Sequence, residues 1–440
     1  MTSTGFLGFH RVLAAVLAAV ALNGLQPLRV LADDSPAPES TKPSTVVTNE
    51  PAQKGRPAAP AAFRAIFTNA TPVAIPRRPN IILITTHGLG YGDLSSYGQK
   101  KFETPNLDRM AANGIRFTNF EAGARASAPV RAALLLGTDP VRSPQSADAD
   151  LALPAGEMTV AQLLRNSGYH TGVIGEWDLG GENSSGAPWK TGFEEFAGYL
   201  NAADAENYYA DYIFRYAPGD YLNVTNNQRE DYLGREMLYP NTGGKRGQYI
   251  PDLYTKAAMN FMVNNQPDAF NRYRPFFLLL NYATPRANTA ETIRAGNGMQ
   301  VPTDAPYSSE AWPPPERNRA AMIARLDGDI GRILEKLQSL NQASNTVVFF
   351  TSVGLPKKTG GVDPQFFRSV LSTNDLRAPM IVHWPGKIPA DQVSGFEWSP
   401  RDFLPTAAEI AYQAAPTNLP GVSVLPVLLG QTRTNQASVR

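Results

Sequence analysis

The stretch RPNIILITTHGLGYGD, residues 78–93, decides the fold of this 440-residue chain. Its apolar and β-branched centre, residues 81–85, shows no alternation of polar and apolar positions. That pattern is typical of a strand whose two faces are both buried in a parallel sheet. Further runs of the same character occur at residues 171–174, 275–282, 346–351 and 380–384.

Segments with apolar residues at helical spacing separate these runs. Strands that alternate with helices predict an α/β fold with a mostly parallel central sheet covered by helices on both faces. In such folds ligands bind beyond the carboxyl ends of the strands. The residues that follow each apolar run are therefore the first candidates for a site. The predicted helices are residues 106–113, 130–136, 159–167 and 319–340.

Composition removes several classes of function. Forty Lys and Arg residues against thirty-nine Asp and Glu give a net charge of +1, so no electrostatic argument favours nucleic acid. The absence of cysteine excludes disulfides, thiolate catalysis, cysteine-based zinc sites and iron–sulfur clusters. With only four histidines in the chain, a multi-histidine metal centre is nearly excluded as well.

The ends of the chain differ from its middle. The apolar run 12–22 follows a basic segment and is too short to span a bilayer, so we expect residues 1–32 to be a signal peptide. An uncleaved anchor or a buried helix is the alternative. Residues 33–77 are rich in Pro, Ala, Ser and Thr and predict a disordered linker. The expected protein is exported to the periplasm or outside the cell, with a folded domain over 78–430 and a loose tail over 431–440.

Polar residues follow several of the predicted strands. His87 comes after the first run, and Glu176 and Asp178 come after the second. Two carboxylates at this spacing could bind a hard cation or act as acid and base, but an ion-paired turn fits them equally well. A lone histidine is more often a hydrogen-bonded loop residue than a metal ligand.

An anion site is predicted at Ser127. Pro129 suits the first turn of a helix, and the free N–H groups of that turn attract anions. Arg131, one turn later, could add charge-assisted hydrogen bonds. From the residues alone, Ser127 could equally be a simple helix cap.

Together these stretches resemble the sulfatases of the alkaline phosphatase superfamily over nearly all of residues 78–430. The resemblance implies an alkaline phosphatase-like three-layer sandwich whose C-terminal subdomain is largely absent, because the sequence stops ten residues after Gly430. The segments that carry it are RPNIILITTHGLGYGDLSSYG, TPNLDRMAANGIRFTNF, SAPVRAALLLGTDP, TVAQLLRNSGYHTGVIGEWDLGG, RAAMIARLDGDIGRILEKLQSLNQASNTVVFFTS, RAPMIVHWPGKIP and GVSVLPVLLG.

The resemblance also implies a mechanism, in which a Cys or Ser in a C/S-x-P-x-R motif becomes formylglycine and a calcium ion stabilises the sulfate. In this chain Ser127 and Arg131 keep that motif. The expected calcium ligands, an Asp pair and an Asp-Asn pair, fall on His87, Gly88, Val353 and Gly354.

Other expected site residues are replaced too. The sulfate-contacting Lys and His positions fall on Glu176, Asp178, Arg286 and Arg368. We therefore expect a sulfatase-like pseudoenzyme without metal or other cofactor, which binds a sulfated glycan or another secreted protein and has no transmembrane segment. The alternative is an active sulfuric ester hydrolase or phosphatase with a rebuilt site centred on Ser127.

Overall fold

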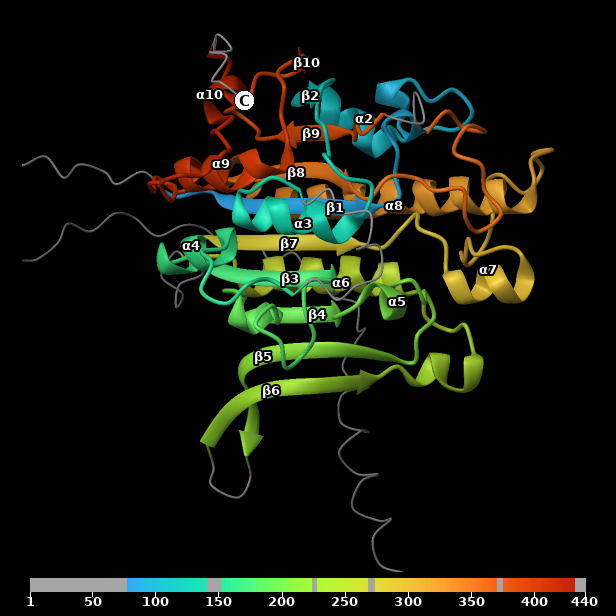
Figure 1. Cartoon of the computed structure of the whole chain (residues 1–440), viewed down its shortest axis with the longest axis horizontal. Coiled ribbons are helices and arrows are strands. Elements are labelled where there is room, and N and C mark those ends of the chain that lie inside the picture. Colours follow the sequence, from blue (N-terminus) through green and yellow to red (C-terminus); the bar gives the residue numbers. More distant parts are fainter. Residues whose placement is uncertain (1–76, 141–151, 224–227, 268–273, 370–374, 432–440) are drawn as a thin grey trace, which may run out of the picture. The chain divides into compact units, whose positions relative to one another are not determined.

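The computed structural model describes residues 77–140, 152–223, 228–267, 274–369 and 375–431 (Figure 1). The predicted signal peptide over 1–32, all but the last residue of the predicted linker over 33–77, and all but the first residue of the predicted tail over 431–440 lie outside these residues. Across the residues described, we find no helix with the length and apolar character needed to cross a membrane.

One mixed sheet runs through the described part of the chain, in the strand order β10-β2-β9-β8-β1-β7-β3-β4-β5-β6. Its centre, β8-β1-β7-β3-β4, is parallel, and antiparallel pairs extend it on both sides. The predicted α/β class with a mostly parallel central sheet is confirmed. The strands are β1 Asn80–His87, β2 Ile115–Phe117, β3 His170–Glu176, β4 Glu195–Tyr199, β5 Tyr212–Asn223, β6 Gln228–Met237, β7 Phe276–Tyr282, β8 Thr346–Val353, β9 Met380–His383 and β10 Gln392–Ser394.

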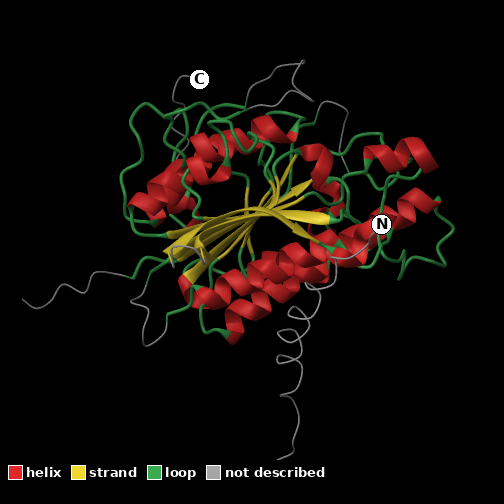
Figure 2. Ribbon diagram, turned by 90° about the horizontal axis from the view of Figure 1, so that it is seen from below, coloured by secondary structure: helices red, strands yellow, loops and turns green. Residues whose placement is uncertain are grey.

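Helices cover the sheet on two sides, which gives the three layers seen in Figure 2. One layer contains α3, α4, α9 and α10, and the other contains α2, α6 and α8. The helices are α2 Pro105–Ala112, α3 Ser127–Leu136, α4 Val160–Asn166, α5 Ala202–Ala205, α6 Ile250–Asn264, α7 Thr289–Ala295, α8 Pro314–Ser339, α9 Phe403–Ile410 and α10 Leu425–Leu428.

The two layers explain why β1 is apolar at successive positions. Side chains alternate between the two faces of a strand. Ile81 and Leu83 pack into the core under α3 and α4, whereas Ile82 and Ile84 pack into the core under α6 and α8. Every residue of β1 is buried, as the unbroken apolar run predicts.

The predicted strands match the observed ones to within two residues, but several other elements differ. α3 begins at Ser127 and not at residue 130, because Pro129 is accommodated in its first turn. α8 likewise begins at Pro314, five residues before the predicted start. The antiparallel strands β5 and β6 were not predicted, since their residues are largely polar or aromatic and lack an apolar run.

Candidate functional site

The central strands end at one edge of the sheet and bring their last residues together there. The parallel register sets His87, at the end of β1, beside Val353 of β8. Glu176 ends β3, with β7 between it and β1. Asn281 of β7 joins the three strands, because it accepts a hydrogen bond from the Thr85 hydroxyl at 2.7 Å and donates one to the Glu176 backbone carbonyl at 2.9 Å. The carboxyl edge is therefore a rigid platform for these side chains.

His87 and Glu176 form a buried hydrogen-bonded pair on this platform. Nδ1 of His87 lies 3.0 Å and 3.2 Å from the two carboxylate oxygens of Glu176. The Glu176 side chain is fully buried, and the His87 side chain is 9% exposed. Because an ionised carboxylate only accepts hydrogen bonds, Nδ1 must carry the proton of the pair. In neutral His87 the other ring nitrogen, Nε2, then keeps a free lone pair.

Two arginines neutralise the Glu176 carboxylate. Arg131 Nη2 lies 3.3 Å from one carboxylate oxygen, and Arg286 Nη1 lies 3.6 Å from the other. Arg131 also donates through Nη1 to the Trp177 carbonyl at 2.9 Å. Nε and Nη2 of Arg131 are buried and have no hydrogen-bond acceptor among the described residues. Nη2 therefore contacts Glu176 as an ion pair without the geometry of a hydrogen bond, whereas Nε has no hydrogen-bond partner among the described residues.

The surroundings lower the pKa of both partners, but for different reasons. Burial lowers the pKa of His87 to about 4, and the charges of Arg286 and Arg131 add to this effect against the attraction of Glu176. Burial by itself opposes ionisation of Glu176, but the hydrogen bond from His87 and the guanidinium groups of Arg131 and Arg286 outweigh it and lower its pKa. At neutral pH the site therefore holds a neutral imidazole beside an ionised carboxylate.

The free edge of His87 faces Gly354 and Ser127. A Cβ atom placed on Gly354 would lie 2.8 Å from His87 Cδ2, 2.9 Å from His87 Nε2 and 3.3 Å from Ser127 Cβ. The space of a side chain at position 354 is thus already filled by the imidazole. Ser127 is the first residue of α3, is 5% exposed, and its hydroxyl makes no hydrogen bond to any described residue.

Of the remaining predicted positions, Asp178 belongs to the His87 network and Arg368 does not. The Asp178 carboxylate lies 3.8 Å from Arg131 Nη1, and burial together with repulsion by Glu176 raises the pKa of Asp178 to about 6. Arg368 is exposed and joins none of the ion pairs of the network within the residues described. Sequence reasoning missed Glu206, which pairs with Arg286 at 2.9 Å. Its only sequence signal is its place shortly after the end of β4.

The four positions at which the resemblance implies calcium ligands do not fit that ion. Calcium takes six to eight oxygen ligands, several of them from carboxylates. Gly88 and Gly354 have no side chain, and Val353 is packed in the hydrophobic core beside α3. His87 offers nitrogen and not oxygen. Among the residues that the structure describes, no group of three His, Asp or Glu side chains is placed to hold a metal ion.

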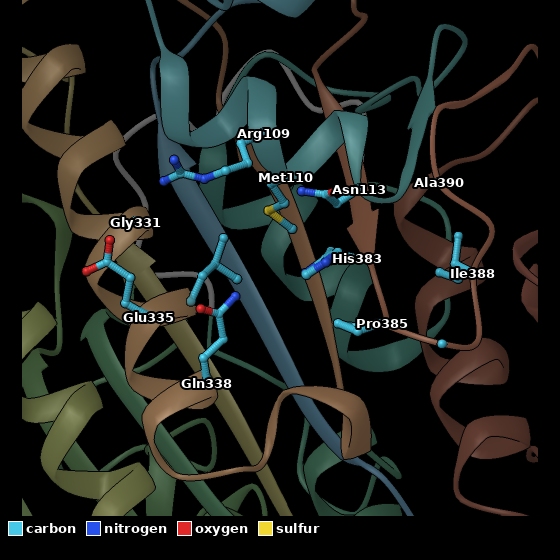
Figure 3. Close-up of a pocket in the computed structure, with 12 residues that line it drawn as sticks. Arg109, Met110, Asn113, Gly331, Glu335, Gln338, His383, Pro385, Ile388 and Ala390 are labelled. Carbon is cyan, nitrogen blue, oxygen red and sulfur yellow. The ribbon is translucent and has the colours of Figure 1, made fainter.

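A cavity of about 730 Å³ lies elsewhere, between α2, α8 and the segment that follows β9 (Figure 3). Met110, Asn113, Glu335 and His383 are among its lining residues. His383 pairs with Val348 near the start of β8, whereas the site described above lies at the end of that strand. The cavity shares no residue with the His87 network.

Comparisons with known proteins agree with the fold and with the resemblance. The family model "Sulfatase" matches residues 79–413. N-acetylgalactosamine-6-sulfatase of Homo sapiens is 31% identical over 377 residues, which are 80% of this chain and 66% of that protein. Arylsulfatase A of Homo sapiens is 30% identical over 392 residues, 84% of this chain and 71% of that protein. The chain spans about two thirds of the length of these curated relatives.

Solved structures give the same result. The crystal structure of Ps i-CgsB in complex with k-i-k-neocarrahexaose has a TM-score of 0.59 and 26% identity, with 80% of this chain and 77% of that chain covered. A structure in complex with its substrate D-glucosamine-2-N,6-O-disulfate has a TM-score of 0.59 at 21% identity, with 82% of each chain covered. The second likeness concerns the fold alone.

Proposed function

Because this chain belongs to the sulfatase family, we propose that it is an exported, glycan-binding protein that does not hydrolyse sulfuric esters by a metal-dependent route. One observation carries the proposal. The positions at which the resemblance implies calcium ligands lie beside the buried His87–Glu176 pair and its two arginines. A cation there would have to displace the imidazole, which fills the space beside Gly354, and the Glu176 carboxylate is already paired with Arg131 and Arg286.

The electrostatics of the network also disfavour a sulfate group. Two guanidinium groups, those of Arg131 and Arg286, face three carboxylates, those of Glu176, Asp178 and Glu206. At neutral pH the carboxylates outnumber the arginines, so an approaching anion finds no net positive charge. Loss of one electrostatic contact in a transition state costs roughly 10²–10³ in rate, and here the metal and several partners are replaced together.

The proposed ligand class comes from the relatives. Their names are those of sulfatases, including an enzyme named for N-acetylgalactosamine-6-sulfate, and one neighbouring structure was solved with an oligosaccharide. Retention of the fold with loss of the metal ligands supports a protein that still binds a glycan of this class, through contacts outside the His87 network, and leaves its sulfate esters intact.

Aryl sulfate hydrolysis tests the proposal directly. Full-length protein is assayed with 4-nitrophenyl sulfate and 4-nitrophenyl phosphate, in calcium and in EDTA, and the peptide that contains Ser127 is weighed. We expect no turnover above that of Ser127→Ala and an unmodified serine mass. EDTA-sensitive release of nitrophenol that Ser127→Ala abolishes would overturn the proposal, and so would a Ser127 peptide lighter by two hydrogens.

Glycan binding needs a separate measurement. We expect the protein to bind immobilised sulfated glycosaminoglycans and to leave their sulfate content unchanged after prolonged incubation. Chemically desulfated chains of the same length are the matched control for the contribution of sulfate. Equal absence of binding to both kinds of chain would contradict the glycan-binding part of the proposal.

A further inference from the structure

We propose that Ser127, His87 and Glu176 form a metal-free nucleophile, base and positioning residue that hydrolyse carboxylic esters. The acyl group is carried by a glycan, and this choice of carrier rests on the function proposed above. The chemistry itself rests on three features of the carboxyl edge of the sheet. They are the His87–Glu176 hydrogen bond, the approach of Ser127 and His87 to one point beside Gly354, and the place of Ser127 at the start of α3.

The His87–Glu176 contact gives the imidazole the tautomer that a general base needs. Glu176 accepts the Nδ1 proton at 3.0 Å, so Nε2 can take up a proton from a nucleophile. Glu176 is held in turn by Arg131 and Arg286. Because Glu176 does not reach the free edge of the ring, it acts as a positioning residue.

Ser127 supplies the nucleophile at the start of α3. Its Cβ and the Nε2 edge of His87 both lie within van der Waals distance of the point where a Cβ of Gly354 would be. The Ser127 hydroxyl makes no hydrogen bond within the described chain and is therefore free to turn toward Nε2 when substrate binds. The first N–H groups of α3, beside Ser127, are the groups available to stabilise a developing oxyanion.

The charges of the site favour an uncharged substrate. A carboxylic ester brings no charge to the network of Arg131, Arg286 and three carboxylates, whereas a sulfate or phosphate ester brings an anion. Acyl transfer by a serine and a histidine also needs no metal to neutralise the transferred group. The class of bond that fits these side chains is thus a neutral acyl ester.

The reaction balances as a hydrolysis. The Ser127 oxygen bonds to the acyl carbon while its proton passes to Nε2 of His87, and the ester C–O bond then breaks as that proton moves to the leaving alcohol. Water attacks the acyl-serine in the same way, which releases the carboxylic acid and restores the Ser127 hydroxyl. The products are one alcohol and one acid for each water consumed.

The test uses the full chain in EDTA with 4-nitrophenyl acetate and glucose pentaacetate. We expect turnover above the spontaneous rate, reduced at least about a hundredfold by Ser127→Ala and by His87→Gln. Ser339→Ala, an exposed serine at the end of α8, is the matched control and should leave turnover unchanged. For Glu176→Gln we expect a lower kcat with little change in KM, and an acid limb of the pH profile displaced to lower pH because the Glu176 charge raises the pKa of His87.

Covalent labelling supplies a readout that does not depend on turnover. A fluorophosphonate should add its mass to the peptide that contains Ser127 in the wild type and in Ser339→Ala, but not in His87→Gln. Thermal unfolding of Ser127→Ala and His87→Gln verifies that both variants are folded. Absence of the adduct, together with equal ester turnover in wild type and Ser127→Ala, would overturn this inference. That result would leave the sulfate and glycan-binding tests of the proposed function unaffected.

Discussion

Two histidine–glutamate clusters in this protein show opposite behaviour. At the carboxyl edge, His87 is paired with Glu176 and its pKa is lowered to about 4, with burial as the main cause. At the other end of β3, His170 lies 2.6 Å from Glu195 and 3.3 Å from Glu194. There burial opposes protonation, but the hydrogen bonds and charges of the two carboxylates outweigh it and raise the pKa of His170 to about 9.

The difference lies in what surrounds each pair. The carboxylate next to His87 is shared with two arginines, so little of its charge remains to hold a proton on the imidazole. Both ring nitrogens of His170 are engaged, since Nε2 contacts the Glu195 carboxylate and Nδ1 contacts the Glu194 carboxylate. His170 therefore has no free ring nitrogen, whereas Nε2 of His87 is free to accept a proton. A histidine beside a glutamate can act as a base at neutral pH where it is unprotonated and one ring nitrogen is left open, which here holds for His87 and not for His170.

The largest expected effect comes from removing the carboxylate charge in each cluster. Glu176→Gln leaves Arg131 and Arg286 buried without their shared counter-charge, and we expect a loss of about 3–5 kcal/mol in the free energy of unfolding. Glu194→Gln is the matched change beside the partly exposed His170 and should cost about 1–2 kcal/mol. Urea unfolding at pH 7 measures both. Equal losses of unfolding free energy in the two variants would contradict this expectation, because burial would then not distinguish the two sites.

Gly354 and Gly168, one near each histidine, allow the two sites to be compared by a steric change, for which we expect a smaller loss of stability. Gly354 has φ +74°, and a Cβ there would lie 2.8 Å from the His87 ring. Gly168, just before His170, has φ +87° and no atom within 4 Å of such a Cβ. We expect Gly354→Ala to lower the unfolding free energy by about 2–3 kcal/mol, through strain and displacement of His87, and Gly168→Ala by about 1 kcal/mol through strain alone.

Changes at His87 sharpen that result further. In the double variant Gly354→Ala, His87→Ala, the added methyl group no longer meets the imidazole, so the two substitutions should be less than additive in thermal unfolding. Strict additivity would indicate that backbone strain accounts for the whole effect at position 354.

Much of this architecture could be predicted from the sequence, and the reasons are local. The unbroken apolar run of β1 indicates by itself that both faces of the strand are buried. Thr159 has the side chain and the position of an N-cap, and it caps α4. Glu176 was expected near the carboxyl edge because it follows a predicted strand, and Ser127 was expected at the start of a helix, whereas Arg286 was named only through the resemblance. These predictions need no knowledge of how distant segments pack.

The pairing inside the site could not be predicted in the same way. His87 and Glu176 are 89 residues apart and meet only because β7 lies between their strands in the sheet order. The sequence left open whether Glu176 binds a cation, acts as acid or base, or is ion-paired, and it could not identify Arg131 and Arg286 as the groups that lie against it. A single sequence does not reveal that an imidazole fills the space beside Gly354. It also does not reveal that Arg368 is exposed.

The dependence of stability on pH above 6.5 tests the His170 cluster separately from His87. A folded-state pKa of about 9, above the ordinary value of 6.5, means that His170 stabilises the fold fully below about pH 6.5 and that this contribution is lost as the pH rises through 9. We expect the unfolding free energy to fall by about 2 kcal/mol between pH 6.5 and 9.5. His170→Gln should flatten that slope, whereas His87→Gln should leave it unchanged. A slope that survives His170→Gln would assign it to other groups.

The smallest expected effect appears in the acid range, where two neighbours of the buried network oppose each other. The lowered pKa of His87 means that the unfolded chain binds the extra proton, so stability falls as the pH drops from about 6.5 to 4. Asp178 acts in the opposite sense, because burial and Glu176 raise its pKa to about 6 and the folded chain takes up its proton first. Removal of this second contribution in Asp178→Asn should make the stability curve steeper between pH 4 and 6, by about 1 kcal/mol over the whole interval. His87 and Glu176 are present in both proteins, so the difference between the two curves reports on Asp178. Parallel curves for wild type and Asp178→Asn would show that Asp178 is not linked to the fold, and the His87 network would then have to account for the acid range alone.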